Sequence, residues 1–350
     1  MDVDQGKLEE FMHRAVVDLG AAASAALVLI GDRLGLYREL ARGPATPLEL
    51  SRRTGTNERY VREWLGNQAA GGYVAFDAES GCYSLTPEQA MALAQEDSPV
   101  FLPGAFQILQ AMWQAEPRIQ ERFRDGGGLP WTEQDRSLFE GTERFFRPGY
   151  LANLPSSWIP SLQGVEAKLR EGATVADVGC GHGASTIIMA KAWPRSRFAG
   201  FDFHRESIET ARRRAAAAGV GDRVTFEVAP ATEFPGDGYD LVCHFDCLHD
   251  LPDPRGAARR AREAVARDGT WMIVEPFAGD RVEENLNPVG RIFYAASTML
   301  CVPNALAFHG DALGAQAGEA RIREIATGAG FRSFRRAAQT PFNLVFEALA

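Results

Sequence analysis

The chain has 350 residues, of which 45% are hydrophobic and 24% are charged, and its formal net charge is −9. At roughly 100–200 residues per domain, this length predicts two or three domains, and the composition excludes a chain that is disordered throughout. The acidic balance argues against a protein that mainly coats nucleic acid or an anionic membrane surface.

We expect no membrane span, because the longest apolar run, Ala21–Ile30, is too short to cross a bilayer. The acidic N-terminus lacks the basic-then-apolar pattern of a signal peptide. The 5 cysteines are widely spread without a C-x-x-C motif, which favours free thiols. These features predict a cytoplasmic protein.

Residues 1–94 read as helices followed by a short hairpin. A helical stretch over 8–40 is expected to break near Gly20, Gly31 and Gly35. Thr46-Pro47 has the pattern of a helix start, with proline at the first helical position. Helices are then predicted over 47–53 and 57–70, and strands over 73–76 and 82–85. Helix, turn, helix and hairpin together form the winged-helix pattern.

Residues 95–165 are dense in Phe, Trp, Pro and Gly, which predicts short helices and a mobile connector that helps to line a pocket. A further domain is expected over 166–350, where from Thr174 onward short apolar runs alternate with helical patterns, as is typical of α/β proteins with a parallel sheet. Two closely spaced runs, 331–337 and 342–348, predict an antiparallel hairpin at the sheet's end. Residues 276–320 are longer than a plain connection requires and are expected to form a lid. The predicted strands of the parallel part are 174–178, 197–201, 224–228, 239–245 and 270–275.

A glycine-rich turn follows the first of these strands in the segment Asp177-Val-Gly-Cys-Gly-His-Gly183. Glycines at a strand-to-helix turn let a ligand lie against bare backbone near a helix N-terminus. Asp202 ends the next strand, 21 residues after Gly181, where an acid can accept both ribose hydroxyls. The spacing of the glycines and the acid also fits a dinucleotide-binding site loosely, but three further features favour S-adenosylmethionine as the ligand. Asp177 stands just before the glycines, a helical domain precedes the motif, and an antiparallel hairpin closes the sheet.

On these residues, 170–350 resemble a class I S-adenosylmethionine-dependent methyltransferase with a Rossmann-like seven-stranded sheet. With residues 10–94, the chain resembles the small-molecule methyltransferases of the plant O-methyltransferase type and their bacterial relatives. Those proteins carry a winged-helix-like dimerisation domain, so the resemblance implies a homodimer and a small-molecule methyl acceptor.

The resemblance implies roles for individual residues. Asp177, Gly179 and Gly181 would border the methionine and ribose portions of S-adenosylmethionine, Asp202 would bind the ribose diol, and Phe203 would lie beside the adenine. Ordinary core packing is the alternative for Phe203. Many relatives have an Asp after the third strand that receives the adenine amino group, whereas this chain has Pro230 there. Adenine recognition would then fall to the backbone of Ala231 or to Thr232.

The transfer site is expected after the fourth strand. In the resembling O-methyltransferases the His of a His-Asp pair is the general base, and His249 with Asp250 matches that pair. The alternative is that His249 belongs to a structural turn that walls the cofactor. Phe245 and Asp246 are expected at the cofactor edge, because they lie at the carboxyl end of a central strand. Although Cys, His and Asp are frequent over 243–250, their spacing is not that of a metal site, so we expect no metal.

The leading interpretation is methyl transfer to a small aromatic or apolar metabolite, through O, with S and N left open. Two alternatives stay open at this point. One is a protein that binds the cofactor without methyl transfer. The other is a DNA-binding regulator that uses residues 57–70 as a recognition helix.

Overall fold

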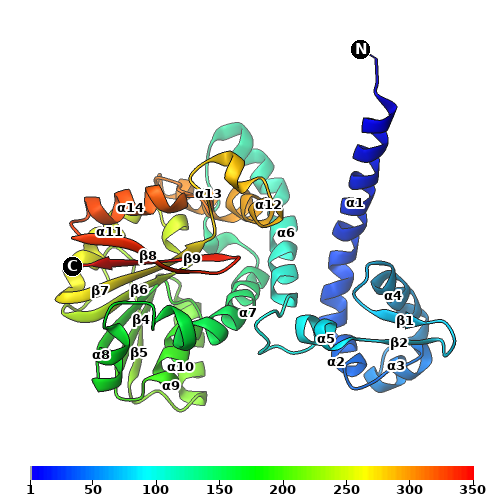
Figure 1. Cartoon of the computed structure of the whole chain (residues 1–350), viewed down its shortest axis with the longest axis horizontal. Coiled ribbons are helices and arrows are strands. Elements are labelled where there is room, and N and C mark those ends of the chain that lie inside the picture. Colours follow the sequence, from blue (N-terminus) through cyan, green and yellow to red (C-terminus); the bar gives the residue numbers. More distant parts are fainter. Residues whose placement is uncertain (1) are drawn as a thin grey trace. The chain divides into compact units, whose positions relative to one another are not determined.

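The computed structural model describes residues 2–350, which form two compact units. Unit 1 combines the chain up to Gln110 with Glu140–Pro148, and unit 2 combines Ala111–Phe139 with Gly149–Ala350. The chain crosses from one unit to the other within two helices, α6 (Pro103–Asp125) and α7 (Arg136–Asn153). Figure 1 labels the elements in chain order.

Helix α1 (Gln5–Arg33) is continuous over 29 residues, so the breaks expected near Gly20 and Gly31 are wrong. A Cβ at Gly31 would lie 2.4 Å from the Trp64 ring, so this glycine lets α1 pack closely on that indole. Glycine inside a helix costs only about 1 kcal/mol relative to alanine, and this packing offsets the cost. The break expected at Gly35 is confirmed, because Gly35 has a φ of 72° between α1 and α2.

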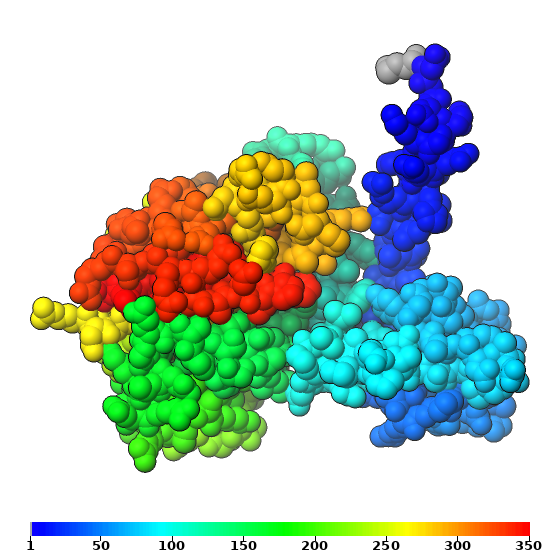
Figure 2. All heavy atoms as spheres, viewed as in Figure 1, coloured from blue at the N-terminus to red at the C-terminus, as the bar shows by residue number. Residues whose placement is uncertain are grey.

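By length and composition alone, α1 is also apolar enough to cross a membrane, with a mean hydropathy of 1.7 in its most apolar window. The expectation of no such segment was wrong by this criterion, because it counted only uninterrupted apolar residues. Core helices of water-soluble proteins pass the same test, but only 28% of this window is buried. In Figure 2 the first turns of α1 extend beyond the other elements of the winged-helix part of unit 1. Exposed apolar side chains on this helix include Phe11, Val16 and Leu19.

The predicted winged-helix pattern is confirmed in unit 1. Thr46 caps α3 (Pro47–Thr54) reciprocally with Glu49, and α3 ends at Gly55 in a left-handed conformation. Asn57 caps α4, whose carboxyl end leads into the two-stranded hairpin. The remaining elements of this unit are α2 (Leu36–Leu40), α4 (Glu58–Ala70), β1 (Ala75–Asp77), β2 (Cys82–Ser84) and α5 (Pro87–Leu93).

A buried ion pair ties the two chain segments of unit 1 together. Asp32, near the end of α1, is 5% exposed and accepts two hydrogen bonds from the Arg144 guanidinium, at 2.8 and 3.1 Å. This paired arrangement satisfies a carboxylate that would be costly to bury alone. The apolar core beside it includes Val28, Tyr37, Leu50, Trp64 and Leu65.

The segment 95–165 differs from the expectation of short helices and a mobile connector, because α6 and α7 span 23 and 18 residues. Both helices continue through an internal proline, Pro117 in α6 and Pro148 in α7. A proline inside a helix removes one backbone hydrogen bond and therefore disfavours the helix. Buried side chains such as Ile119 and Leu138 anchor the two helices nonetheless. Shorter elements here are η1 (Trp131–Glu133) and η2 (Leu154–Trp158).

Unit 2 contains a seven-stranded sheet in the order β5-β4-β3-β6-β7-β9-β8. Neighbouring strands from β5 to β7 are parallel, whereas β9 and β8 are antiparallel. The predicted α/β class with an antiparallel carboxyl-terminal hairpin is confirmed. The strands are β3 (Thr174–Val178), β4 (Arg197–Asp202), β5 (Val224–Val228), β6 (Tyr239–Phe245), β7 (Val265–Pro276), β8 (Ser333–Gln339) and β9 (Asn343–Leu349).

Helices cover both faces of this sheet, with α8, α9 and α10 on one side and α11 and α14 on the other (Figure 1). Alanines of α11, including Ala257 and Ala261, are fully buried against the sheet with Trp271 and Phe346. All five parallel strands therefore present their carboxyl ends along one edge, where ligands bind in such sheets. The helices are α8 (Val165–Glu171), α9 (Ala184–Ala192), α10 (Arg205–Ala217), α11 (Pro254–Ala264) and α14 (Gly318–Gly328).

The insertion at 276–320 folds into short helices, and whether it acts as a lid stays a prediction. In Figure 2 its amber atoms form a continuous surface with the red carboxyl-terminal strands. Its elements are η4 (Val282–Asn285), α12 (Pro288–Ala296), η5 (Ser297–Cys301) and α13 (Val302–Ala307).

Candidate active site

The glycine turn between β3 and α9 is built from left-handed residues. Gly179, Gly181 and Gly183 have φ values of 76°, 51° and 79°. A Cβ at Gly179 would lie 2.7 Å from the sulfur of Cys247, and one at Gly183 would lie 2.6 Å from the Phe226 ring. The backbone conformation therefore favours glycine at all three positions, and lack of space also requires it at Gly179 and Gly183.

Asp177 lies at the end of β3 and is 1% exposed. Its Oδ2 accepts hydrogen bonds from the Ser185 and Thr186 hydroxyls at the start of α9, both at 2.6 Å. Its Oδ1 has no partner among residues 2–350. Burial raises the pKa of this carboxyl to about 6. A buried acceptor without a partner beside a glycine turn fits the binding of a donor group from a ligand.

Asp202 is held at the end of β4 by backbone donors. Its two carboxylate oxygens accept the N–H groups of Gly181 at 2.9 Å and His204 at 2.8 Å. Burial raises the pKa of Asp202. The neighbouring Phe203 is 45% exposed, so its ring is not part of a packed core.

The turn after β5 holds the residues predicted near adenine. Pro230 accepts a hydrogen bond from the Glu233 N–H at 3.0 Å, which fixes a tight turn. Ala231 packs against the core of unit 2, and Thr232 is half-buried beside Gly256.

The end of β6 carries a polar cluster of which the sequence identified Asp246 but not its two partners. Asp246 has a φ of 50°, and its two oxygens accept hydrogen bonds from the Tyr150 hydroxyl at 2.9 Å and the Asn343 amide at 2.8 Å. Burial, with a contribution from the charge of Glu275, raises the pKa of Asp246 to about 8. Phe245 is buried, with its ring 5.6 Å from that of Tyr150. Tyr150 and Asn343 lie far from Asp246 in the chain, so no local pattern could have indicated them.

His249 lies in η3 (Leu248–Asp250) and is paired with a carboxylate from the next strand. Its Nδ1 lies 2.6 Å from Oε2 of Glu275, at the end of β7, and both side chains are buried. The other oxygen of Glu275 accepts the Leu248 N–H at 3.0 Å. Burial alone lowers the pKa of His249, but the charge of Glu275, with a smaller contribution from Cys301, outweighs it and holds that pKa well above its usual value.

Glu275 was missed as a functional residue. The signal available was a single carboxylate ending an otherwise apolar strand, Trp-Met-Ile-Val-Glu275. A charge in such a position is costly unless it is paired, so it points to a partner at the sheet edge.

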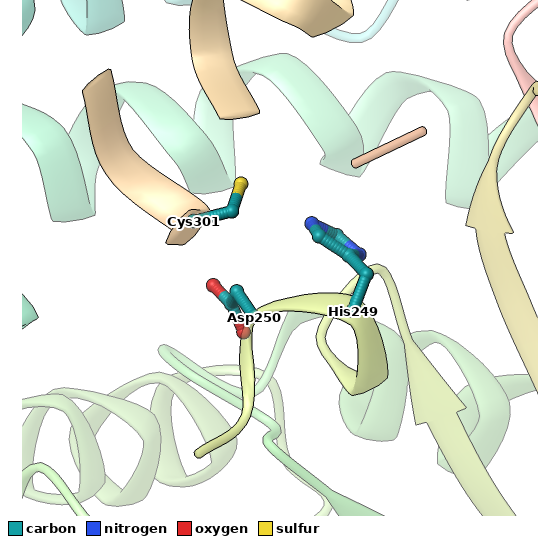
Figure 3. Close-up of side chains that lie close together, drawn as sticks. All are labelled: His249, Asp250 and Cys301. Atoms are coloured by element: carbon teal, nitrogen blue, oxygen red, sulfur yellow. The ribbon is translucent and has the colours of Figure 1, made fainter. Parts of the chain in front are cut away.

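Asp250 and Cys301 lie beside His249 (Figure 3). One ligand atom from each of these three residues lies within 4.8 Å of the other two. Burial raises the pKa of Asp250 to about 7. Cys301 belongs to η5 in the insertion, so this cluster joins the sheet edge to the segment 276–320.

His244 has a different environment despite its nearby position in sequence. It is fully buried in β6, and its Nδ1 accepts the Trp271 indole N–H at 3.0 Å. Burial lowers the pKa of His244 to about 3, which keeps this ring neutral in the core.

The structure thus brings the predicted cofactor-binding turn and the predicted transfer site together. Because β3 and β6 are neighbours, the glycine turn and the segment after β6 meet, and Cys247 donates to the carbonyl of Val178 at 3.4 Å. The Cys247 side chain also packs against Gly179, where it fills the space that a Cβ would need.

Comparison with known proteins assigns both parts of this architecture. Residues 169–338 match the family model of a methyltransferase domain, and residues 22–95 match an Rv2258c-like winged HTH domain. Residues 169–338 therefore form a methyltransferase domain. The resemblance drawn from the sequence, and S-adenosylmethionine as the cofactor of this domain, are confirmed.

Individual methyltransferases are similar to this one over part or all of its length. The 27-O-demethylrifamycin SV methyltransferase of Amycolatopsis mediterranei is 30% identical over 57% of the chain, and the aligned part covers 57% of that relative's own length. A mitomycin 7-O-methyltransferase structure matches 99% of this chain and 100% of its own, with a TM-score of 0.74 and 19% identity. The structure of a methyltransferase in calicheamicin biosynthesis, in its S-adenosylhomocysteine-bound form, matches 100% of this chain and 100% of its own, with a TM-score of 0.67 and 19% identity.

The residues of this domain fit the cofactor. Gly181 offers bare backbone with open space where a Cβ would be, and Asp177 Oδ1 is a buried acceptor that lacks a partner among residues 2–350. The oxygens of Asp202 already hold the turn through Gly181 and keep lone pairs for a diol.

Proposed function

We propose that this chain is an O-methyltransferase that acts on a small aromatic or apolar metabolite, with His249 as the general base. The observation that carries the proposal is the buried His249–Glu275 pair, placed after β6 next to the glycine turn. Relatives named for methyl transfer to oxygen support the choice of acceptor atom, with S and N as the alternatives.

We assign each nitrogen of His249 a separate task in this proposal. Because Nδ1 is bonded to Glu275, Nε2 is the nitrogen left to accept a proton from an acceptor hydroxyl. Glu275 fixes the ring orientation and stabilises the imidazolium that forms when the proton arrives. Asp250, next in the chain, adds a second carboxyl near the ring.

The cofactor supplies a methyl group that is already activated on a sulfonium. The chain must therefore align the acceptor and remove its proton. Asp177, Gly179 and Gly181 are proposed to border the methionine and ribose portions, and Asp202 to accept the ribose hydroxyls.

We also propose residues that contact the adenine ring and the edge of the cofactor. The exposed ring of Phe203 supports a position beside the adenine, with Ala231 and Thr232 at its rim. Phe245 and Asp246 are proposed at the edge nearest the acceptor, since they follow β6.

The DNA-binding alternative is not favoured by α4. On this helix Arg62 pairs with Glu58 at 2.6 Å, and Arg59 pairs with Glu63. These arginines are therefore already neutralised by carboxylates four residues away, which weakens a phosphate-binding face.

A cytoplasmic homodimer is the proposed form of the protein. The exposed apolar residues on α1, such as Phe11 and Leu19, offer area for a second copy to cover. The 5 cysteines are all free thiols, which suits a reducing compartment.

The test is methyl transfer from labelled S-adenosylmethionine to a panel of phenols and other hydroxylated metabolites. His249→Ala should lower kcat by about 10²–10⁴-fold while S-adenosylhomocysteine affinity changes little. His309→Asn is the matched control, because His309 is exposed and asparagine tolerates its φ of 57°. An unchanged kcat in His249→Ala would remove His249 from the mechanism. Binding of S-adenosylhomocysteine without transfer to any acceptor would favour the alternative of a cofactor-binding protein.

A further inference from the structure

We propose that His249, Asp250 and Cys301 form a binding site for one Zn²⁺ ion, and that the bound ion blocks methyl transfer. The three residues are an imidazole, a carboxylate and a thiol whose ligand atoms already lie within 4.8 Å of one another. The side chains come from η3 and η5 and lie close together (Figure 3).

The donor set selects the metal. Imidazole nitrogen, thiolate sulfur and carboxylate oxygen are the ligands of Zn²⁺, whereas Mg²⁺ and Ca²⁺ prefer oxygen alone. Bonds of about 2.0–2.3 Å to a tetrahedral Zn²⁺ place its ligand atoms roughly 3–4 Å apart. The present separation therefore requires only a small contraction, and three protein ligands leave the fourth position open.

The ligands are also held from behind, as ligands of protein-bound zinc usually are. Glu275 bonds Nδ1 of His249, which orients the ring and leaves Nε2 for the metal. Asn304 donates to the backbone carbonyl of Asp250 at 2.9 Å and accepts the Trp131 N–H at 3.0 Å. The turn that carries Asp250 is thereby fixed to α13.

The inhibitory effect rests on the proposed function. A Zn²⁺ ion on Nε2 uses the lone pair that the general base needs for the acceptor proton. Binding also releases the thiol proton of Cys301 and, where the ring is protonated, the Nε2 proton of His249 to solvent, so the affinity for Zn²⁺ should rise with pH. The site would make transfer sensitive to free zinc and reversible by a chelator.

The binding test uses the full chain after chelator treatment, with Co²⁺ as an optical substitute and Zn²⁺ in calorimetry. We expect one ion per chain and a thiolate-to-cobalt charge-transfer band. Cys301→Ala should lose the band and bind Zn²⁺ at least about 10-fold more weakly. Asp250→Asn should keep the band but also bind more weakly. Cys82→Ala, which changes a cysteine in unit 1, is the control and should behave as the unchanged chain does.

The outcomes separate the two proposals. Absence of the band in the unchanged chain, or Zn²⁺ binding by Cys301→Ala equal to that of the unchanged chain, would overturn the metal site and leave methyl transfer untouched. Zn²⁺ should suppress transfer and EDTA should restore it, so a band with undiminished transfer would overturn the inhibition. If the metal-free chain transfers no methyl group, the proposed function fails while the cobalt band still decides the site.

Discussion

Replacing Glu275 by glutamine changes one buried atom and should disable the proposed base. In the structure, Oε1 of Glu275 accepts the Leu248 N–H and Oε2 faces Nδ1 of His249. If the glutamine oxygen stays with Leu248, its NH₂ group faces Nδ1, which must then act as an acceptor. The proton moves to Nε2, and this tautomer cannot accept a proton from the substrate. If the amide turns round, its NH₂ group meets the Leu248 N–H instead.

Either orientation leaves a buried mismatch, which costs about 1–3 kcal/mol. At 1.4 kcal/mol per factor of ten, this cost alone corresponds to a roughly 5- to 150-fold loss of rate. The variant also loses the negative charge that stabilises the imidazolium. We therefore expect kcat to fall by about 10²–10⁴-fold in total, with S-adenosylhomocysteine affinity nearly unchanged.

The pH profile gives an independent readout. Glu275 holds the pKa of His249 well above its usual value, and the base works only when neutral. The rate of the unchanged enzyme should thus rise with pH through that raised pKa. In Glu275→Gln the remaining rise should move to lower pH, because the opposing charge is gone.

The assay is kcat against pH with labelled S-adenosylmethionine, beside calorimetry with S-adenosylhomocysteine. Glu227→Gln is the control, because Glu227 is exposed on β5 of the same sheet. A Glu275→Gln variant with the kcat and pH profile of the unchanged enzyme would refute the assignment of this pair.

Three further predictions concern the cofactor site and α1. Gly179→Ala should lower the melting temperature and weaken S-adenosylhomocysteine binding, because its left-handed φ costs about 1–2 kcal/mol in alanine and the methyl group meets Cys247. Gly221→Ala, whose added methyl group would meet only Ala216 at an ordinary contact distance of 3.9 Å, should change neither the melting temperature in scanning calorimetry nor the affinity in titration calorimetry. Asp202→Asn should weaken S-adenosylmethionine binding by about 10- to 100-fold through loss of a charged acceptor, and a calorimetric affinity equal to that of the unchanged chain would count against the ribose contact. Leu19→Glu should shift the chain from dimer to monomer in light scattering, since Leu19 is 71% exposed on α1; an unchanged mass, or flotation of the unchanged chain with lipid vesicles, would contradict dimerisation through this helix.

Local signals in the sequence were sufficient for the frame of the molecule. The spacing from Gly181 to Asp202 follows from one strand-helix-strand repeat, so the glycine turn and the acid could be placed on neighbouring strands. The cap at Thr46-Pro47 likewise needs only adjacent residues. Local signals failed where packing outweighed them, as in α1, which continues through Gly31 against Trp64.

By itself, the sequence determined the order of the elements, the parallel sheet with its final hairpin, and the glycine turn with its acid. These depend on side-chain periodicity and on backbone conformations that few residues can adopt. Only the tertiary structure decided which groups surround His249. Glu275 and Cys301 come from elements 26 and 52 residues further along the chain, and their contacts arise because β7 pairs with β6 and the insertion folds back over their ends. No local pattern encodes such meetings, since the free energy that produces them comes from burying the sheet and helices as a whole.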